Sequence, residues 1–202
     1  MSTSGTMSRA AGTVIAETRA WVERAVIGLN LCPFAKAVQI KNQIRYAVSD
    51  ATDAEALLGT LREELRLLAA ADPAQVETTL LIHPRVLTSF PDFNGFLGVA
   101  DAALEALGYA GVLQVASFHP QYQFAGTAAD DVTNATNRSP YPTLHLLREA
   151  SIDRAVAAFP EAKTIYERNI RTLQALGPQG WAVLQSRCRS DAEDAENGDR
   201  RG

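Results

Sequence analysis

The chain is poor in the residues that mark several common classes of protein. Only two of its 202 residues are cysteines, Cys32 and Cys188, which argues against a fold held by disulfides. The net charge is −4 and no Lys- or Arg-rich run occurs, which argues against nucleic-acid and membrane-surface partners. No apolar stretch approaches bilayer length, and residues 1–12 contain no apolar signal region. We therefore expect a cytoplasmic protein whose partner is a small molecule.

The remaining composition is that of one folded domain. Hydrophobic residues make up 47% of the chain and charged residues 21%, enough for a single well-buried core. Residues 1–12 are small and polar, and the residues from about 186 onward are charged and without a period. We predict a disordered N-terminus over 1–12, a single α/β domain over 13–185 and a disordered charged tail over 186–202.

Hydrophobic periodicity divides the domain into alternating helices and strands. Helical spacing covers about 13–29, 52–68, 93–107, 143–159 and 160–176, and short apolar runs cover 44–48, 78–83 and 112–119. The order strand, helix, strand, helix, strand predicts right-handed crossovers. The expected α/β fold is a small, largely parallel sheet of about three strands, covered by helices and followed by a C-terminal helical pair.

Two of the predicted strands end in the same dipeptide, His-Pro. His83 precedes Pro84 and His119 precedes Pro120, and proline keeps the residue before it extended without continuing a sheet ladder. Each histidine should therefore stand at the carboxyl end of its strand. In open α/β sheets, ligands bind at that edge. The sequence predicts a histidine-lined pocket there, and His145 joins it if it opens the helix that follows.

The segment between residues 121 and 142 has neither helical nor strand periodicity. It is too long for an ordinary connection and combines polar side chains with prolines and aromatic residues such as Phe124 and Tyr141. Loops of this kind are functional or disordered, and the rigid residues favour an ordered, functional loop.

The predicted pocket allows acid–base chemistry. We assign His119 as the general acid or base and His83 as a second proton carrier or an electrophile. No cofactor is predicted, although His83 and His119 with Asp130 or Asp131 form a chemically sensible set of metal ligands. Their spacing matches no known metal-binding motif. The alternative is that both histidines only cap strand ends.

Cys32 offers a second chemistry. A thiol becomes a useful nucleophile when a histidine, a cation or a helix N-terminus lowers its pKa. Cys32 is followed by Pro33 and has no second cysteine close by, which argues against a dithiol oxidoreductase. The alternative is an unreactive core cysteine.

Arginines near the predicted pocket indicate an anionic ligand. Arg85 follows the first His-Pro and Arg138 lies late in the loop, where either guanidinium can hold a carboxylate or phosphate. The alternative is that each arginine ties a loop to a backbone carbonyl or to a nearby acid. The other predicted substrate contacts are Asn137, Tyr141, Gln123 and His145.

Three longer strings carry a resemblance to a known family. They are Gly28-Leu29-Asn30-Leu31-Cys32-Pro33-Phe34-Ala35, the stretch from Ala116 to Phe124, and the stretch from Asn137 to His145. Over about residues 13–181 the chain resembles the bacterial proteins grouped as the DUF1415 family of unknown function. The resemblance implies family membership and no activity.

These observations lead to two functional hypotheses. The first is a small enzyme that acts on a polar, anionic metabolite at the histidine pocket, through histidine acid–base chemistry with help from Cys32 or a metal. The second is a non-catalytic module that binds a ligand or protein through the 121–142 loop. The sequence specifies neither the reaction nor the substrate.

Overall fold

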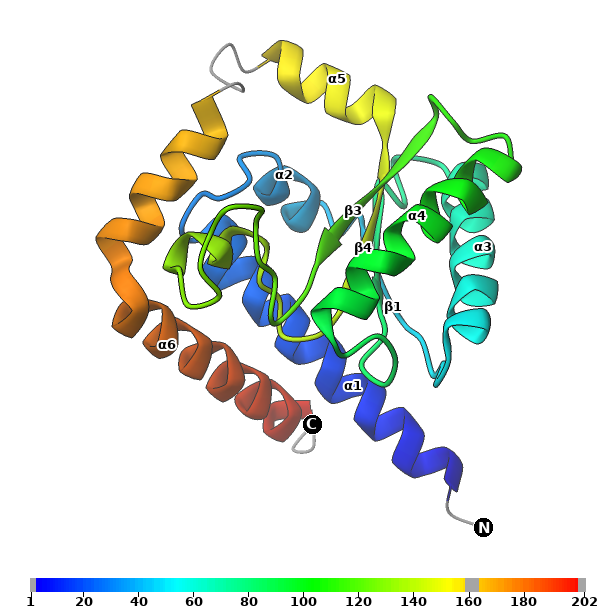
Figure 1. The fold of residues 1–202 in the computed structure, drawn as a ribbon. Coiled ribbons are helices and arrows are strands. Elements are labelled where there is room, and N and C mark those ends of the chain that lie inside the picture. Colours follow the sequence, from blue (N-terminus) through cyan, green and yellow to red (C-terminus); the bar gives the residue numbers. More distant parts are fainter. Residues whose placement is uncertain (1–2, 159–163, 200–202) are drawn as a thin grey trace.

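The structure, a computed structural model, describes residues 3–158 and 164–199. From β1 to β4, helices and strands alternate along the chain, and the strands form one sheet with helices on both faces (Figure 1). The elements are α1 (Thr3–Trp21), the π-helix η1 (Val22–Ile27), α2 (Ala35–Ile40), β1 (Ile44–Val48), α3 (Ala54–Ala70), β2 (Thr78–Ile82), α4 (Phe90–Ala106), β3 (Leu113–Phe118), the 3₁₀ helix η2 (Val132–Asn137), β4 (Thr143–Arg148), α5 (Glu149–Ala158) and α6 (Ile165–Asp199).

The sheet has four strands in the order β1-β2-β4-β3. β1 and β2 are parallel, whereas β4 is antiparallel to both of its neighbours. β2 and β3 therefore run in the same direction, with β4 between them. The α/β class is confirmed, but the prediction of about three largely parallel strands is wrong, because the sequence interpretation missed the strand that lies between the two His-Pro strands.

The missed strand, β4, was predicted to be the start of a helix. Leu144 and Leu147 are three residues apart, which fits a helical stripe, but the observed period is two. Leu144 and Leu146 are both fully buried in the core layer on one face, and His145 between them belongs to the other face. Because β4 is hydrogen-bonded on both sides, its residues satisfy their backbone groups in the ladder and no helix forms before Glu149.

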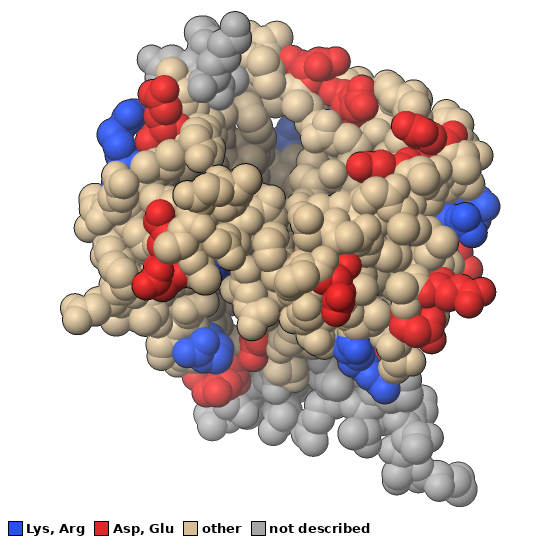
Figure 2. Space-filling model, viewed as in Figure 1, with Lys and Arg blue, Asp and Glu red and all other residues tan. Residues whose placement is uncertain are grey.

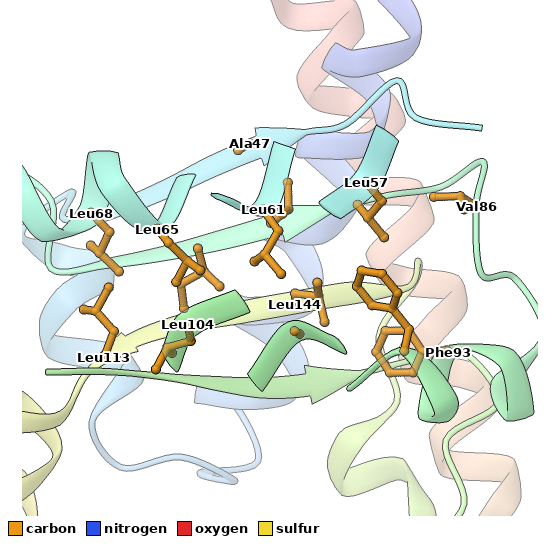
Figure 3. Packing of buried hydrophobic residues seen from close by; sticks show 14 residues of the cluster. Ala47, Leu57, Leu61, Leu65, Leu68, Val86, Phe93, Leu104, Leu113 and Leu144 are labelled. Atoms are coloured by element: carbon orange, nitrogen blue, oxygen red, sulfur yellow. The ribbon is translucent and has the colours of Figure 1, made fainter. Parts of the chain in front are cut away.

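One face of the sheet is covered by α3 and α4. The helix α3 begins at its N-cap Asp53, whose side chain accepts a hydrogen bond from the Ala56 N–H at 2.8 Å. Of the predicted stripe, Leu57, Leu61, Leu65 and Leu68 are fully buried at helical spacing and Leu58 is half-buried. Figure 3 shows this core layer extending from Leu68 and Leu113 at one end to Phe93 and Val86 at the other. The second end is the one at which β2 and β3 finish.

The other face is covered by α1 and α6, which lie side by side (Figure 1). Trp21 at the end of α1 packs edge-on against Phe118 of β3, with ring centroids 5.2 Å apart. The predicted helix end at Gly177-Pro178 is confirmed, because Gly177 has a non-helical φ of 70° and ψ of 170° and α6 consists of two helical segments that meet there at a kink. Positive φ costs glycine little, so the helix changes direction there without strain. Residues 159–163, including Phe159 and Pro160 of the predicted helical pair, lie outside the described residues.

Helices extend into parts of both terminal segments. The helix α1 begins at Thr3, inside the segment 1–12 that was predicted to be disordered. α6 extends to Asp199, inside the predicted disordered tail, and buries Cys188 and Ala192. An ion pair joins Arg24 to Asp191. Although the tail is rich in charged residues, its apolar residues Cys188 and Ala192 are buried, and Cys188 packs against Ala20 of α1.

Arg148, the last residue of β4, links the sheet to the end of α3. Its Nη2 donates to the carbonyl oxygens of Leu68 at 2.6 Å and Ala71 at 2.7 Å, and it also lies 3.1 Å from the Val76 carbonyl oxygen. The last carbonyls of a helix have no partner inside the helix and carry partial negative charge. The guanidinium of Arg148 therefore caps the C-terminal end of α3.

Within residues 3–158 and 164–199, no helix combines the length and apolarity needed to cross a bilayer. In the view of Figure 2, acidic and basic side chains are interspersed without a broad basic patch.

Candidate functional site

The two His-Pro histidines lie at one edge of the sheet. The His83 N–H donates to the Pro142 carbonyl at 3.0 Å, and the His119 N–H donates to the Asn137 carbonyl at 3.1 Å. Their strands run in the same direction, so both imidazoles follow carboxyl ends, as the proline pattern predicts. The strands are not adjacent, however, and the segment leading into β4 enters between them.

His83 is fully buried and has one nitrogen without a partner. Its Nδ1–H donates to the Val86 carbonyl at 3.0 Å, which places the lone pair of the neutral ring on Nε2. Among the described residues, no group is within hydrogen-bonding distance of that Nε2. Burial lowers the pKa of His83 to about 4, so the ring is neutral at physiological pH. A buried acceptor without a partner is costly and calls for an explanation.

His119 is also fully buried, but both of its nitrogens are engaged. The Gln121 N–H donates to Nδ1 at 3.0 Å, and Nε2–H donates to the Leu87 carbonyl at 3.2 Å. Burial lowers the pKa of this histidine as well. With neither nitrogen available, His119 holds the backbone segments on each side of it. This is the strand-capping alternative for His119, and it does not fit the predicted role of principal acid or base.

Phe93 of α4 separates the two imidazoles. Its ring is stacked on His83 with centroids 5.7 Å apart and tilted against His119 at 5.1 Å. Phe90 lies 5.5 Å from His119 and 5.0 Å from Tyr122, so aromatic rings continue from the core to the loop. The sequence analysis placed Phe93 only in a helical stripe. Its position directly after the first His-Pro loop was the available signal.

Residues 84–89, here called the covering segment, close the edge over these rings. Val86 and Leu87 supply the two carbonyls that bind the histidines. Leu87 has a φ of 54°, a left-handed conformation that is unfavourable for a branched side chain. The segment is therefore held in place by imidazole hydrogen bonds while one residue carries backbone strain.

The 121–142 loop is ordered by bonds among its own residues. Asn134 is fully buried, accepts from the Phe124 N–H at 3.0 Å and donates to the Ala128 carbonyl at 2.8 Å. Asp131 accepts from the N–H and the hydroxyl of Thr133, which lower its pKa. These bonds agree with the prediction of an ordered loop. They also occupy the side chains of Asn134 and Asp131, which are therefore less available to a ligand.

Arg138 is tied to the loop itself. Its Nε donates to the Tyr122 carbonyl at 3.2 Å, and its Nη2 donates to the Ala129 carbonyl at 2.6 Å. The sequence is compatible with two roles of Arg138, an anion clamp and a structural tie. The geometry matches the structural tie, because both carbonyls are drawn together by one guanidinium.

We expect Arg138→Ala to lower the free energy of unfolding by about 1–3 kcal/mol, because it leaves two carbonyls unpaired. Urea unfolding at neutral pH measures this change. Arg85→Ala is the matched control, since Arg85 is exposed and its removal should change stability by less than about 0.5 kcal/mol. Equal stability of the two variants would contradict the structural role of Arg138.

The remaining predicted contacts are dispersed. The Tyr141 hydroxyl donates to Glu17 Oε2 of α1 at 2.7 Å, and burial raises the tyrosine pKa. Asn137 Nδ2 donates to the Ser117 carbonyl at 3.1 Å, and Gln123 Nε2 donates to the Thr127 carbonyl at 2.6 Å. Asp130 and Arg85 are exposed. Of this set, Arg85 alone belongs to the covering segment beside His83.

His145 lies on β4, so its expected place at the start of a helix is wrong. It faces the α1 side of the sheet, where its ring is 5.9 Å from that of Phe118. Thr78 Oγ1 donates to the Leu146 carbonyl and accepts from His145 Nε2 at 2.7 Å. Burial lowers the pKa of His145 to about 4. The three histidines therefore do not converge, since His83 and His119 flank Phe93 in the opposite core layer.

Cys32 lies between η1 and α2, and its environment does not activate it. Burial raises the pKa of the thiol, and hydrogen bonds from the Phe34 and Ala35 N–H groups, with the charge of Arg168, offset this only in part. At neutral pH the protonated form predominates, and the thiolate is the nucleophile. The surroundings of Cys32 favour the unreactive alternative.

No metal centre is assembled by the described side chains. Within residues that the structure describes, no three His, Cys, Asp or Glu side chains lie close enough together to hold an ion. Asp131 is engaged by Thr133, and His119 has no free nitrogen. The predicted set of His83, His119, Asp130 and Asp131 is thus not brought together.

These features define a small mixed α/β protein with a closed, histidine-containing edge beneath a covering segment. The chain belongs to the DUF1415 family of proteins of unknown function, which matches residues 13–183. Searches of the curated proteins and of the solved structures gave no match. The function must therefore be argued from the site itself.

Proposed function

We propose that the protein is an enzyme that acts on a small, polar, anionic metabolite at the carboxyl edge of the sheet, with His83 as its acid–base group. The observation that carries the proposal is the buried Nε2 of His83, the one imidazole nitrogen at this edge that has no partner among the described residues. A ligand O–H or N–H group would complete its hydrogen bonding.

The orientation of His83 supports a role as a base. The Val86 carbonyl holds Nδ1–H, so the ring is fixed in the tautomer whose lone pair is on Nε2. A base held by a second hydrogen bond is the usual arrangement in acid–base catalysis. The low pKa of His83 keeps this lone pair free of a proton at neutral pH. This assignment exchanges the two histidines: His83 is the base, and His119 is the positioning residue.

Access to His83 depends on the covering segment. Movement of its second half, from Leu87 onward, would break the His119–Leu87 hydrogen bond and release the strained conformation of Leu87, while the Val86 carbonyl keeps its bond to His83. Arg85 is exposed on the same segment, so its guanidinium is the candidate contact for the ligand's negative charge. The alternative, a binding module that uses the 121–142 loop, has less support because Asn134, Asp131 and Arg138 are bonded within that loop.

We expect His83→Asn to weaken ligand binding at least about tenfold while the fold is kept, a loss of about 1.4 kcal/mol. The asparagine amide can take the place of Nδ1–H at the Val86 carbonyl and has no atom at the Nε2 position. A thermal-shift screen of carboxylated and phosphorylated metabolites against wild type identifies ligands. Calorimetry with both proteins then measures the loss.

His83→Gln is the companion variant, because its longer side chain places an amide near the Nε2 position and removes the bond to Val86. It should bind better than His83→Asn and unfold more easily. Equal affinity of wild type and His83→Asn for a stabilising metabolite would refute the role of His83. A broad anion panel that leaves the wild-type Tm unchanged would refute the anionic substrate class.

A further inference from the structure

A second concave site lies at the opposite edge of the sheet. It is an open hollow of about 370 Å³, a volume in the range of small-ligand sites. The walls come from α1, β1 and the turn before it, the end of α3 and the segment before β2. The lining residues are Ile15, Arg19, Asn42, Ile44, Arg45, Tyr46, Leu67, Gln75 and Val76. The hollow borders the N-terminal ends of β1 and β2, so it is distinct from the histidine edge.

The residues that line the hollow include two arginines, Arg19 and Arg45, and no Asp or Glu. Arg45 bonds Glu64 through Nε at 2.8 Å and Nη2 at 2.9 Å. Glu64 is only 8% exposed, so this pair is held in one geometry. Because Nε and Nη2 of Arg45 both donate to Glu64, the guanidinium is fixed and its third nitrogen, Nη1, remains as an oriented donor.

Arg19 supplies the second positive charge. Its guanidinium lies 5.1 Å from the centre of the Tyr46 ring, a cation–π contact. Within the described part of the chain, no carboxylate oxygen lies within 4 Å of Arg19. Tyr46 does not supply a negative charge either, because burial raises its pKa to about 12 and its hydroxyl donates to Gln39 Oε1 at 3.1 Å.

Apolar side chains complete the hollow. Ile15, Ile44, Leu67 and Val76 line it, and Leu67 is 41% exposed although it is a large hydrophobic residue. An inorganic anion would contact the guanidiniums and leave this apolar surface in water. An organic anion would contact both kinds of surface, because its charged group can reach the arginines while its apolar part covers the apolar side chains.

We propose that this hollow binds a small organic carboxylate, held by Arg19 and by Nη1 of Arg45, with its apolar body against Ile44, Leu67 and Val76. Glu64 and Tyr46 are positioning residues that orient the two guanidiniums. The site is independent of the function proposed for His83, since it lies at the other edge of the sheet and shares no residue with the histidine edge.

Benzoate is the probe, and amide NMR spectra of the full chain are the readout. Benzoate should saturate with a Kd on the order of 1 mM at low salt and shift the amide signals of Ile44, Tyr46 and Val76. Benzamide, which has the same shape and no charge, should bind at least fivefold more weakly. His83 signals should stay unchanged, which separates this site from the histidine edge.

Arg19→Gln should weaken benzoate binding at least fivefold, because it removes one of the two positive charges that line the hollow. It is preferred to an Arg45 variant, which would leave Glu64 buried and unpaired. Arg62→Gln is the matched control, since Arg62 is an exposed arginine of α3 outside the hollow. The proposal is overturned if benzoate fails to saturate, if both variants bind it equally, or if benzamide or inorganic phosphate binds as tightly.

Discussion

Lowering the pH from 7 to 5 should remove about 4 kcal/mol from the free energy of unfolding through His83 and His145, and His119, whose pKa is also lowered, adds to this loss. The pKa values of His83 and His145 are each lowered to about 4 by burial, whereas an unfolded histidine has its pKa near 6.5. Below about pH 6.5 the unfolded chain binds protons that the folded chain does not. The stabilisation is therefore complete above pH 6.5 and is lost as the pH falls toward 4. At about 2 kcal/mol for each ring by pH 5, the loss is a large share of a typical domain's stability.

Urea unfolding at pH 7.5, 6 and 5 measures this dependence. The window above pH 5 is informative because ordinary carboxylates stay ionised through it. The variant His83→Asn lacks one of the histidines whose pKa is lowered, so its stability should fall less steeply with pH than that of wild type. If the urea concentration at the midpoint of unfolding is the same at pH 7.5 and pH 5, these imidazoles are not held neutral by burial.

Replacing Phe93 by alanine should cost about 3–5 kcal/mol, the second large effect expected here. Phe93 is fully buried and its ring touches both edge histidines. The substitution leaves a cavity beside two imidazoles that depend on dry surroundings for their low pKa values. Water entering that cavity would stabilise the protonated ring, so the pKa of His83 should rise toward its ordinary value.

Phe96→Ala is the matched control for this prediction. Phe96 lies in the same helix and the same core layer and is 5% exposed. It should lose a comparable amount of stability without moving the pKa of His83. Urea unfolding gives the first quantity, and NMR titration of the imidazole signals gives the second. Equal pKa values of His83 in wild type and both variants would contradict the role of Phe93 in excluding water.

Part of this architecture could be predicted from the residues. The helix α3 followed from the spacing of Leu57, Leu61, Leu65 and Leu68, all fully buried. The shared edge of His83 and His119 followed from proline stereochemistry, which acts locally and does not depend on strand order. Strand order itself depends on partners distant in sequence. For this reason the chain direction at both histidines was predicted correctly and their adjacency was not.

The candidate site was less predictable because hydrogen-bond partners decide what a side chain can do. His83 and His119 stand in the same sequence context, yet one has a free nitrogen and the other has none. The difference arises from the Val86 and Leu87 carbonyls and the Gln121 N–H, which are backbone groups with no signature in the residue types. Arg138 likewise looked suited to a ligand anion and is occupied by two loop carbonyls.

The position of β4 has a consequence for how the chain reaches its native state. This strand lies between β2 and β3 but follows both in sequence, so until residue 148 is made β2 is paired with β1 alone and β3 has no partner. The C-terminal end of α3 cannot be capped before the same strand is made, because Arg148 of β4 donates the capping hydrogen bonds. Contacts between such distant residues are slow to form, and during synthesis they expose apolar strand edges to other chains. Folding of this domain thus depends on one late segment, and release of the nascent chain before residue 143 would yield a fragment prone to aggregation.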